Sequence, residues 1–282
     1  MGRFESLLRR PRWTGVACAV GAVGLGLVYM MIAGAPAAYL MINAGACVLG
    51  LLILVMLDHL GPALRRQSGA ATLVLSLALL ATALLGDRVE GAARWIDLGV
   101  LTVQPSLVLL PVMIAGFAGS RDALSTAGVL VAAIALAIQP DRAMSAMLVS
   151  GLAALTVFRR DRLTVTALIG SAIGFAATLA QADTLPAMPF VEQIFYTSFD
   201  VSVIAGLAVL GGAILLLVPA IAGWVYDAGN RQTYCVFGAI WLAAIAAAAA
   251  GNYPTPVAGY SGGAVLGYVL SLTMLPSANT PL

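Results

Sequence analysis

The stretch that decides the fold is residues 14–34, which read TGVACAVGAVGLGLVYMMIAG without a single charged side chain. A second uncharged run, AAYLMINAGACVLGLLILVML, follows almost at once at residues 37–57. A helix needs about 20 apolar residues to cross roughly 30 Å of hydrocarbon, at about 1.5 Å per residue. Both runs have this length, so the sequence predicts two membrane-crossing helices joined by a short turn at Pro36.

The rest of the chain also has the composition of a polytopic membrane protein. Of the 282 residues, 61% are hydrophobic and only 9% are charged, whereas about 25% of the residues of a soluble domain are charged. The formal net charge is +2 and all 14 basic residues are arginine, so a surface for nucleic acid is not expected. The three cysteines lie in apolar runs without metal-ligand spacing. Neither a disulfide framework nor a zinc site is therefore expected.

We predict an all-α polytopic membrane bundle of about ten transmembrane helices, forming one membrane domain over residues 1–282. Glycine- and proline-containing breaks separate the apolar runs. The predicted spans lie near residues 14–34, 37–57, 70–86, 104–118, 123–139, 143–158, 163–180, 199–222, 233–250 and 258–275.

The arginines predict which side of the membrane each loop faces. Cytoplasmic loops of membrane proteins are enriched in Lys and Arg. With the N-terminus inside, ten spans place eleven of the 14 arginines in the cytoplasm and leave three outside, Arg88, Arg94 and Arg142. The pattern alternates from loop to loop as the rule requires, so both termini are predicted to lie in the cytoplasm.

The acidic residues gather on the predicted outer face. Seven of the twelve lie there: Asp87, Glu90, Asp97, Asp141, Asp183, Glu192 and Asp200. Arg94 and Trp95 stand among them, in a segment suited to the level of the lipid headgroups. Mixed charges on one membrane surface could bind a charged, membrane-bound substrate, with the Arg94 guanidinium donating to a phosphate. They could equally form a hydrated rim with local ion pairs, and the residues alone leave both interpretations open.

Other polar and small residues have simpler interpretations. Gly259, Gly263 and Gly267 share one face of the last span, a spacing that permits close helix packing. Asn43, within the second span, is expected to donate a hydrogen bond to a neighbouring helix. Plain solvation at the interface is expected for the acids near cytoplasmic arginines, Asp58, Asp122, Asp161 and Asp227.

Four segments resemble motifs of the SEDS family, the RodA/FtsW-like proteins of cell shape and cell division. They are ARWIDLG at 93–99 followed by QPS at 104–106, QPD at 139–141, VEQIFYTSFD at 191–200, and GNYPTP at 251–256 followed by GYSGG at 259–263. The segments occur in the family's order and between the corresponding spans. The ten-span plan is also similar, so the resemblance covers nearly the whole chain.

The resemblance implies a peptidoglycan glycosyltransferase of the bacterial inner membrane, which polymerises lipid II or another undecaprenyl-linked precursor at the outer face. Its implied protein partner is a single-span class B penicillin-binding transpeptidase. Glu192 stands at the position of the family's essential carboxylate, so the resemblance makes it the catalytic general base. Arg94 would hold the pyrophosphate. The other implied substrate-binding residues are Trp95, Gln104, Asp141 and Asp200. No cofactor is implied, and a divalent cation at the pyrophosphate stays open.

This chain departs from the family pattern at several positions. The family's glutamate after QPS is Leu107 here, and the lysine expected three residues later is Leu110. The outer loop before the eighth span, residues 181–198, is short. Two alternatives therefore stay open: an inactive SEDS-like scaffold or regulator that binds a transpeptidase or a lipid-linked precursor, and a transporter of such a precursor. Convergence of Arg94, Asp141 and Glu192 on one groove that opens sideways to lipid would favour catalysis. A Glu192 side chain that points away from the others, or a loop that covers a closed bundle, would favour the scaffold.

Overall fold

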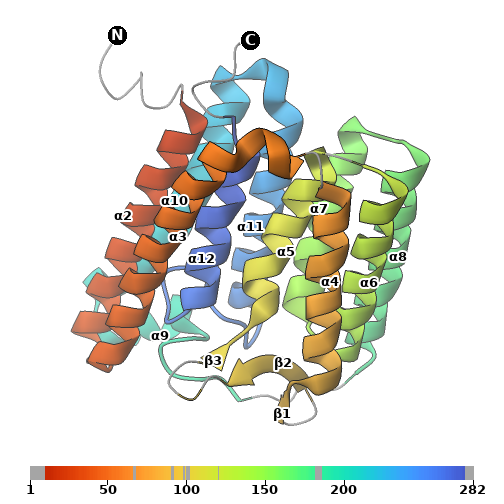
Figure 1. Cartoon of the computed structure of the whole chain (residues 1–282). Helices are drawn as coiled ribbons and strands as arrows, with labels where there is room; N and C mark the ends of the chain where they lie inside the picture. The colour runs from red at the N-terminus through yellow and green to blue at the C-terminus, as the bar shows by residue number, and fades with distance from the viewer. Residues whose placement is uncertain are drawn as a thin grey trace.

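The structure is a computed structural model, and it describes residues 10–65, 68–89, 92–97, 99, 102–119, 121–181 and 186–276. Within these residues, ten helices of at least ten residues run side by side as one bundle (Figure 1). They are α2 (Pro11–Ile32), α3 (Ala37–Arg65), α4 (Ser68–Leu85), α5 (Pro105–Gly119), α6 (Ala123–Ile138), α7 (Arg142–Phe158), α8 (Arg162–Leu179), α10 (Val203–Tyr226), α11 (Arg231–Ala250) and α12 (Gly262–Ser271). Each overlaps one predicted span, and the predicted all-α polytopic fold class is confirmed.

The helices fall into two length classes. Five apolar stretches are long enough to cross a bilayer, namely Pro11–Ile32, Ala37–His59, Arg162–Leu179, Val203–Tyr226 and Ala228–Ala250. Five further apolar helices of the described chain have only 10–17 residues, and at about 1.5 Å per residue even the longest of them cover about 25 Å. Two of them, α5 and α12, are preceded by non-helical segments. Such backbone is tolerated at membrane depth where protein surrounds it.

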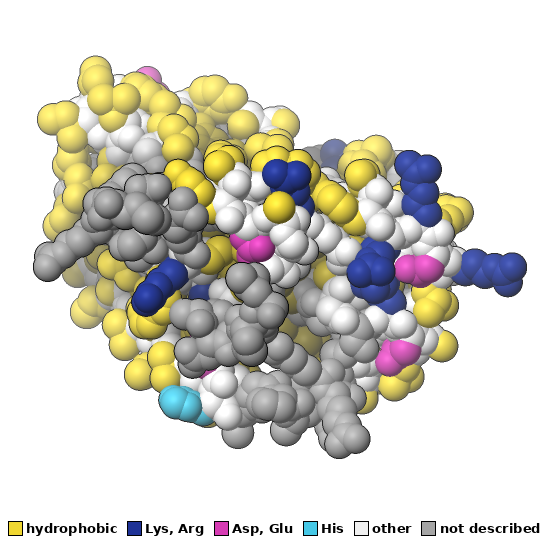
Figure 2. Space-filling view, turned by 90° about the horizontal axis from the view of Figure 1, so that it is seen from above, with side chains coloured by type: hydrophobic (Ala, Val, Ile, Leu, Met, Phe, Trp, Pro, Cys, Tyr) yellow, Lys and Arg dark blue, Asp and Glu magenta, His cyan; other side chains and the backbone are white. Residues whose placement is uncertain are grey.

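The two ends of the bundle differ in charge. α2 begins and the 3₁₀ turn η2 (Leu272–Met274) ends at the same end, which is uppermost in Figure 1. Figure 2 looks down onto this end and shows dark-blue arginine side chains standing on it. The turns that follow α5, α7 and α10 bring their arginines here, and these are Arg121, Arg159, Arg160, Arg162 and Arg231. The chain thus alternates between the two ends as predicted for a bundle with both termini inside.

A small antiparallel sheet, which the sequence did not predict, lies at the opposite, predicted outer end. Its strands are β1 (Asp87–Val89), β2 (Ala92–Asp97) and β3 (Thr102–Val103), in the order β1-β2-β3. Ile96 of β2 pairs with Val103 of β3. Strands this short show no alternation long enough to recognise, so only their mutual pairing reveals them.

The predicted boundary between the outer loop and the eighth span, at residue 199, is also wrong. A separate helix, α9 (Ile194–Val201), begins within the predicted loop, and α10 begins at Val203. The break lies at Ser202, whose hydroxyl accepts a hydrogen bond from the amide of Ala205 at 3.1 Å. A serine at this position satisfies an amide that a helix start leaves without a partner. The chain can therefore turn here although both flanks are apolar.

Glycines let neighbouring helices approach closely, as predicted for the last span. A Cβ atom at Gly267 of α12 would collide with the carbonyl oxygen of Leu107 in α5. Between α4 and α6, a Cβ atom at Gly128 would lie 2.9 Å from the amide nitrogen of Leu73. Because the atoms met are backbone atoms, they cannot rotate aside as a side chain would. These positions therefore fix the distance between the helices.

Two acids at the predicted cytoplasmic end cap helices, so the expectation of plain solvation is wrong for them. The carboxylate of Asp122 accepts a hydrogen bond from the amide of Ser125 at 2.6 Å, and that of Asp161 from the amide of Thr164 at 2.9 Å. These backbone hydrogen bonds lower the pKa of both carboxyl groups. Ionised caps at the first turns of α6 and α8 also interact favourably with the helix dipoles.

Arg12 links three parts of the chain at the predicted cytoplasmic end of the bundle. The residue is only 7% exposed. Its Nε and Nη2 donate to the carbonyl oxygen of Leu275 at 3.0 and 2.6 Å, and Nη2 also donates to that of Thr273 at 3.1 Å. Nη1 pairs with Asp58 of α3. Asp58 is thus an ion-pair partner, and α2, α3 and the segment after α12 are held together.

Candidate functional site

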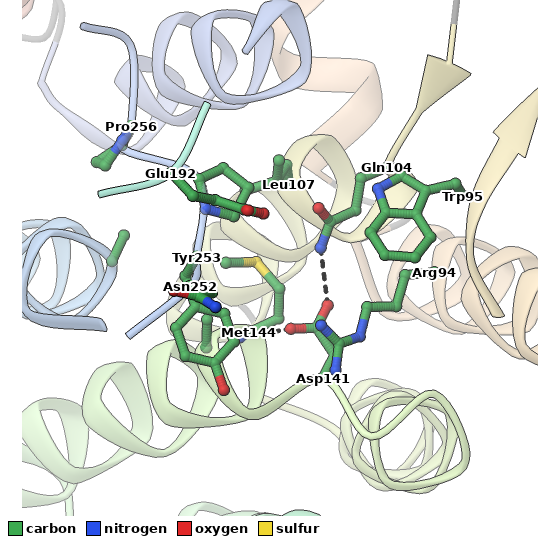
Figure 3. Close-up of a pocket in the computed structure, with 13 residues that line it drawn as sticks. Arg94, Trp95, Gln104, Leu107, Asp141, Met144, Glu192, Asn252, Tyr253 and Pro256 are labelled. Carbon is green, nitrogen blue, oxygen red and sulfur yellow. Dashed lines mark hydrogen bonds between the residues drawn. The ribbon is translucent and has the colours of Figure 1, made fainter. Parts of the chain in front are cut away.

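A pocket lies at the end of the bundle that carries the strands (Figure 3). Its walls come from β2, the N-terminal ends of α5 and α7, α11, and the segments that precede α9 and α12. The cavity volume is about 10 Å³, room for about one water molecule. Five of the six predicted site residues line it, although they come from four separate segments: Arg94, Trp95, Gln104, Asp141 and Glu192.

Asp141 is the centre of a buried hydrogen-bond network that joins the QPS and QPD segments. The residue is 1% exposed. Its Oδ2 accepts from Nε2 of Gln104 at 2.9 Å and from the hydroxyl of Ser106 at 3.1 Å. Its Oδ1 accepts from the amide of Met144 at 3.2 Å, which caps α7. A buried carboxylate is costly unless donors surround it, so these three donors explain how an acid stays at this depth in one orientation.

Arg94 binds the backbone turn that presents Asp141. Its guanidinium donates from Nε to the carbonyl oxygen of Gln139 at 3.1 Å and from Nη2 to that of Pro140 at 2.5 Å. The residue is 4% exposed, and its guanidinium carbon lies 5.9 Å from the centre of the Trp95 ring. These contacts fix the turn between α6 and α7, so Arg94 positions Asp141. Its expected contact with a pyrophosphate stays a prediction.

Glu192 approaches the pocket from a different wall. Figure 3 shows its carboxylate pointing into the pocket in the direction of Gln104, and not away from the other charged site residues. The amide of Met188 donates to Oε2 at 2.8 Å and so orients the carboxylate. The residue also forms an isolated β-bridge with Pro254. Its placement meets the convergence part of this condition, while a groove open sideways to lipid and a role of Glu192 as general base stay predictions.

The backbone on both sides of Glu192 is strained. Phe190 and Gln193 have φ angles of 64° and 56°, in the left-handed region that non-glycine residues rarely adopt. The Phe190 carbonyl oxygen accepts a hydrogen bond from the amide of Tyr260 at 2.7 Å, and the Val191 carbonyl oxygen accepts one from the amide of Thr255 at 2.9 Å. Both donors belong to the segment at residues 254–261, which leads into α12. Such conformations persist only where the surroundings hold them, and they often occur at functional sites.

Asn43 holds the segment at residues 254–261 in place through two hydrogen bonds. Its Nδ2 donates to the carbonyl oxygen of Gly259 at 2.7 Å, and its Oδ1 accepts from the amide of Ser261 at 3.1 Å. The residue is 1% exposed. Asn43 thus donates a hydrogen bond as expected, and its partners are the backbone that leads into α12 and the residue that caps this helix. Since this backbone pairs with residues 190–192, Asn43 supports the position of Glu192.

Asp200 is the predicted site residue that the structure does not bring to the pocket. It is exposed on α9 and does not line the cavity. Arg142, also predicted at the outer face, donates from Nε to the carbonyl oxygen of Thr178 at 3.2 Å and joins α7 to the end of α8. Glu90 and Asp183 lie outside the described residues, as do the side chains of Asp87 and Arg88.

Comparisons with known proteins bear on the fold. No family model matches the chain, and no curated protein matches its sequence. Two crystal structures of the rod shape determining protein RodA from Thermus thermophilus match it, each with a TM-score of 0.64. An aspartate-to-alanine mutant is 21% identical, with 92% of this chain and 94% of that chain covered, and the other structure is 20% identical, with 92% and 93% covered. This chain has the fold of RodA. The resemblance inferred from the four segments is thereby confirmed at the level of the fold.

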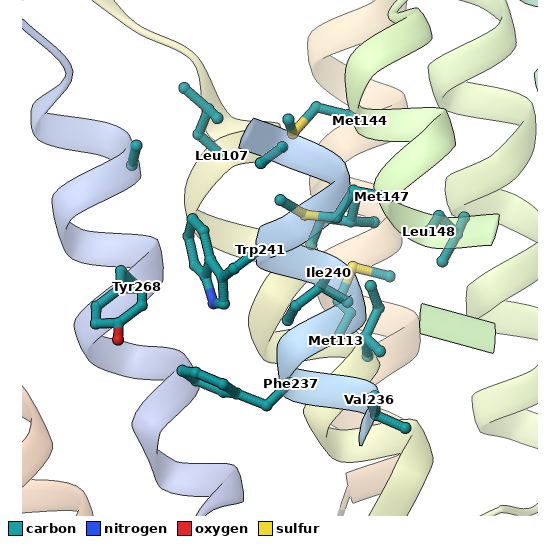
Figure 4. Packing of buried hydrophobic residues seen from close by; sticks show 14 of the residues in the cluster. Leu107, Met113, Met144, Met147, Leu148, Val236, Phe237, Ile240, Trp241 and Tyr268 are labelled. Atoms are coloured by element: carbon teal, nitrogen blue, oxygen red, sulfur yellow. The ribbon is translucent and has the colours of Figure 1, made fainter. Parts of the chain in front are cut away.

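On this RodA-type fold, Leu107 and Leu110, which stand where the resembling motif has charged residues, belong to the apolar core. Leu107 and Leu110 are 5% and 0% exposed. Figure 4 shows Leu107 in the buried cluster that also contains Met144 and Trp241. Leu107 lines the pocket as well, so one wall of the pocket is a surface of the core. Apolar replacement of a buried ion pair is often neutral or favourable for stability.

Two lining residues of the RodA-type bundle, Asn252 and Tyr253, were not singled out from the sequence. The Oδ1 atom of Asn252 accepts from Nε2 of Gln193 at 2.5 Å, which ties the segment before α12 to the start of α9. Their position directly before the PTP run at 254–256, within a resembling segment, is the signal that could have revealed them. Within the described residues, no group of three or more His, Cys, Asp or Glu side chains could hold a metal ion.

Proposed function

We propose that this chain is a SEDS-type protein of bacterial cell-wall synthesis, which works as a peptidoglycan glycosyltransferase at the outer face of the inner membrane. The observation that carries the proposal is the convergence of Arg94, Asp141 and Glu192 on one pocket. The RodA-type fold supports it, since all three residues lie in segments that resemble family motifs. The substrate class is a lipid-linked sugar, either lipid II or another undecaprenyl-linked precursor.

The proposed chemistry needs one base in the pocket. The acceptor hydroxyl oxygen bonds to the anomeric carbon of the donor sugar, the bond from that carbon to the diphosphate breaks, and the base takes the hydroxyl proton. Glu192 is better suited to this than Asp141, because its carboxylate points into the pocket and the residue is only half-buried. Three donors already hold the carboxylate of Asp141. Asp141 and Arg94 therefore shape the wall that faces the base.

The size of the pocket sets a condition on the proposal. A cavity of about 10 Å³ cannot enclose a sugar ring. The sugar must therefore bind at the rim, within reach of Glu192 and Trp95, or the wall segments must separate when it binds. Movement of the segment before α9 would have to break its backbone hydrogen bonds and bridge to residues 254–260, the Gln193–Asn252 hydrogen bond and the contact between the Phe190 and Tyr39 rings.

The proposal is tested with purified protein and lipid II in detergent, by measuring the rate at which glycan polymer forms. Replacing the carboxylate by the neutral amide of Glu192→Gln should lower the rate about 10²- to 10⁴-fold, the usual contribution of a general base. Asp97→Asn is the matched control, since Asp97 is an exposed acid at the same end that does not line the pocket. A wild-type protein that forms no polymer, with or without a co-purified class B transpeptidase, would overturn the proposal.

A second candidate function is an inactive SEDS-like scaffold or regulator that binds a transpeptidase or a lipid-linked precursor. The apolar Leu107 and Leu110 and the small pocket favour it. In this case wild type and Glu192→Gln would both form no polymer, while a class B transpeptidase would co-purify equally with both. Co-purification and polymerisation measured on the same samples therefore separate the two functions.

A further inference from the structure

The predicted cytoplasmic end of the bundle carries two arginines whose guanidinium groups are anchored on one side only. Arg159, directly after α7, donates from Nε to Oε1 of Gln232 at 3.0 Å. Arg231, at the start of α11, donates from Nε to the carbonyl oxygen of Trp224 at 3.2 Å. Both arginines are exposed. The two anchors belong to adjoining turns, so the guanidinium groups stand over the same part of the bundle.

The outer nitrogens of both guanidinium groups have no partner within the described residues. No hydrogen bond or ion pair is made by Nη1 or Nη2 of Arg159 or Arg231 there. The acids at this end are engaged elsewhere: Asp161 caps α8 and pairs with Arg121 at 3.4 Å. Asp227, expected to be merely solvated, accepts from the hydroxyl of Tyr234 at 2.6 Å. Two fork-shaped sets of donors are thus available to an anion.

An apolar surface lies directly beneath these donors. The rings of Phe158 and Trp224 meet edge to face with centroids 6.3 Å apart, and they are 38% and 42% exposed. The guanidinium carbon of Arg231 lies 5.2 Å from the centre of the Trp224 ring. Val157 and Val225 beside them are 68% and 61% exposed. Donors at the helix ends with exposed apolar side chains just below them match the headgroup and acyl regions of a bilayer leaflet.

We propose that Arg159 and Arg231 form a binding site for the phosphate of an anionic phospholipid in the inner leaflet, whose acyl chains lie against Phe158 and Trp224. Anchoring at Nε fixes each guanidinium before the lipid arrives, so less side-chain freedom is lost on binding. The apolar side chains below the arginines match the acyl region of the leaflet, so the donors stand at the depth of the lipid phosphates, which favours a lipid over free phosphate. This site is independent of the outer pocket and of the proposed activity there.

The test uses the full chain in detergent and native mass spectrometry to count bound lipid during titration with phosphatidylglycerol or phosphatidylcholine. The double variant Arg159→Gln with Arg231→Gln should weaken phosphatidylglycerol binding about 10- to 30-fold, since each arginine near anionic lipid contributes about 1 kcal/mol. The matched control is Arg160→Gln with Arg162→Gln, which removes the same charge from exposed arginines at the same end. The control should weaken binding less than about threefold. Equal thermal unfolding of the two double variants without added lipid shows that both are folded.

Three results would overturn the site. Equal weakening in the two double variants would show diffuse attraction by the whole positive face. Equal binding of phosphatidylglycerol and phosphatidylcholine by the wild type would show that the headgroup charge is not recognised. Displacement of phosphatidylglycerol by millimolar inorganic phosphate would show a site for a soluble anion. Preferential binding of phosphatidylglycerol that resists phosphate and depends on Arg159 and Arg231 supports the proposal.

Discussion

Substituting Asn43 by alanine should detach the segment that leads into α12 from α3. The substitution removes two buried hydrogen bonds, to the carbonyl oxygen of Gly259 and from the amide of Ser261. Each contributes about 1 kcal/mol net, and a buried backbone group left without a partner costs about 1–3 kcal/mol. Some relaxation of the segment is expected, so the loss of unfolding free energy should be about 2–4 kcal/mol.

The measurement is reversible denaturant unfolding in one detergent, with wild type, Asn43→Ala and a control from the same helix. Met41→Ala is the matched control, because Met41 is 67% exposed and its truncation leaves no internal cavity. The control should lie within about 0.5 kcal/mol of wild type, as surface substitutions usually do. If the outer pocket is catalytic, Asn43→Ala should also slow glycan polymerisation, since the segment it holds pairs with the backbone of Glu192.

Equal stability of Asn43→Ala and Met41→Ala would refute the reasoning. It would mean that the other hydrogen bonds of the segment, such as that from the Tyr260 amide to Phe190, hold it without Asn43. A stability loss in Asn43→Ala with no change in the polymerisation rate would refute only the link to Glu192.

Three further substitutions test other contacts. Gly267→Ala should lose about 1–3 kcal/mol relative to Gly45→Ala in thermal or denaturant unfolding, because its Cβ meets the backbone of α5 whereas that of Gly45 meets nothing within 4 Å; equal stability would contradict the close packing. Asp161→Ala should cost about 1 kcal/mol at pH 7 through loss of the α8 cap. The folded state lowers the pKa of Asp161, so the stability from this cap is present above the unfolded pKa of about 3.9 and is lost as the pH falls through the folded pKa. The difference in unfolding free energy between wild type and Asp161→Ala should therefore be smaller at about pH 3 than at pH 7. A difference that does not change with pH would contradict the cap. Arg12→Gln should lower the unfolding free energy by about 2–4 kcal/mol through its lost hydrogen bonds, and wild-type stability would show that the clamp contributes nothing.

The membrane helices could be predicted from the sequence because each corresponds to a continuous apolar run. An apolar run of about 20 residues is typical of a membrane helix, and the arginines predict which loops lie inside and which outside. The β2–β3 pairing and the break at Ser202 correspond to no recognisable pattern in the sequence. Two- to six-residue strands have no usable period, and a single serine between apolar residues is not a recognisable helix boundary.

The candidate site was predictable as a set of residues and not as a set of contacts. The motifs named Arg94, Gln104, Asp141 and Glu192, which lie together in the pocket. That Arg94 donates to backbone carbonyls could not be read from the sequence, because carbonyl groups occur at every residue and only the fold selects two of them. The same reason hides the partners of Asn43, which lie 216 and 218 residues away.

The helix caps were within reach of the sequence. Asp122 and Asp161 each precede a hydroxyl residue by three positions at the start of an apolar run, which is the spacing of an N-cap signal. Their proximity to arginines suggested interfacial charges instead. Both carboxylates accept a backbone hydrogen bond within the first turn of their helix. Within the described residues only Asp161 also pairs with an arginine, so the cap is the interaction that the two share.

The central claim is that Glu192 is the base of a glycosyltransferase in the outer pocket. It is tested most directly by the rate of lipid II polymerisation for wild type, Glu192→Asp and Glu192→Gln in the same proteoliposomes. The account predicts that the aspartate variant, which keeps a carboxylate one methylene shorter, retains a measurable rate, and that the glutamine variant falls about 10²- to 10⁴-fold below wild type. Equal rates for the aspartate and glutamine variants, or polymer formation by Glu192→Gln at the wild-type rate, would contradict it.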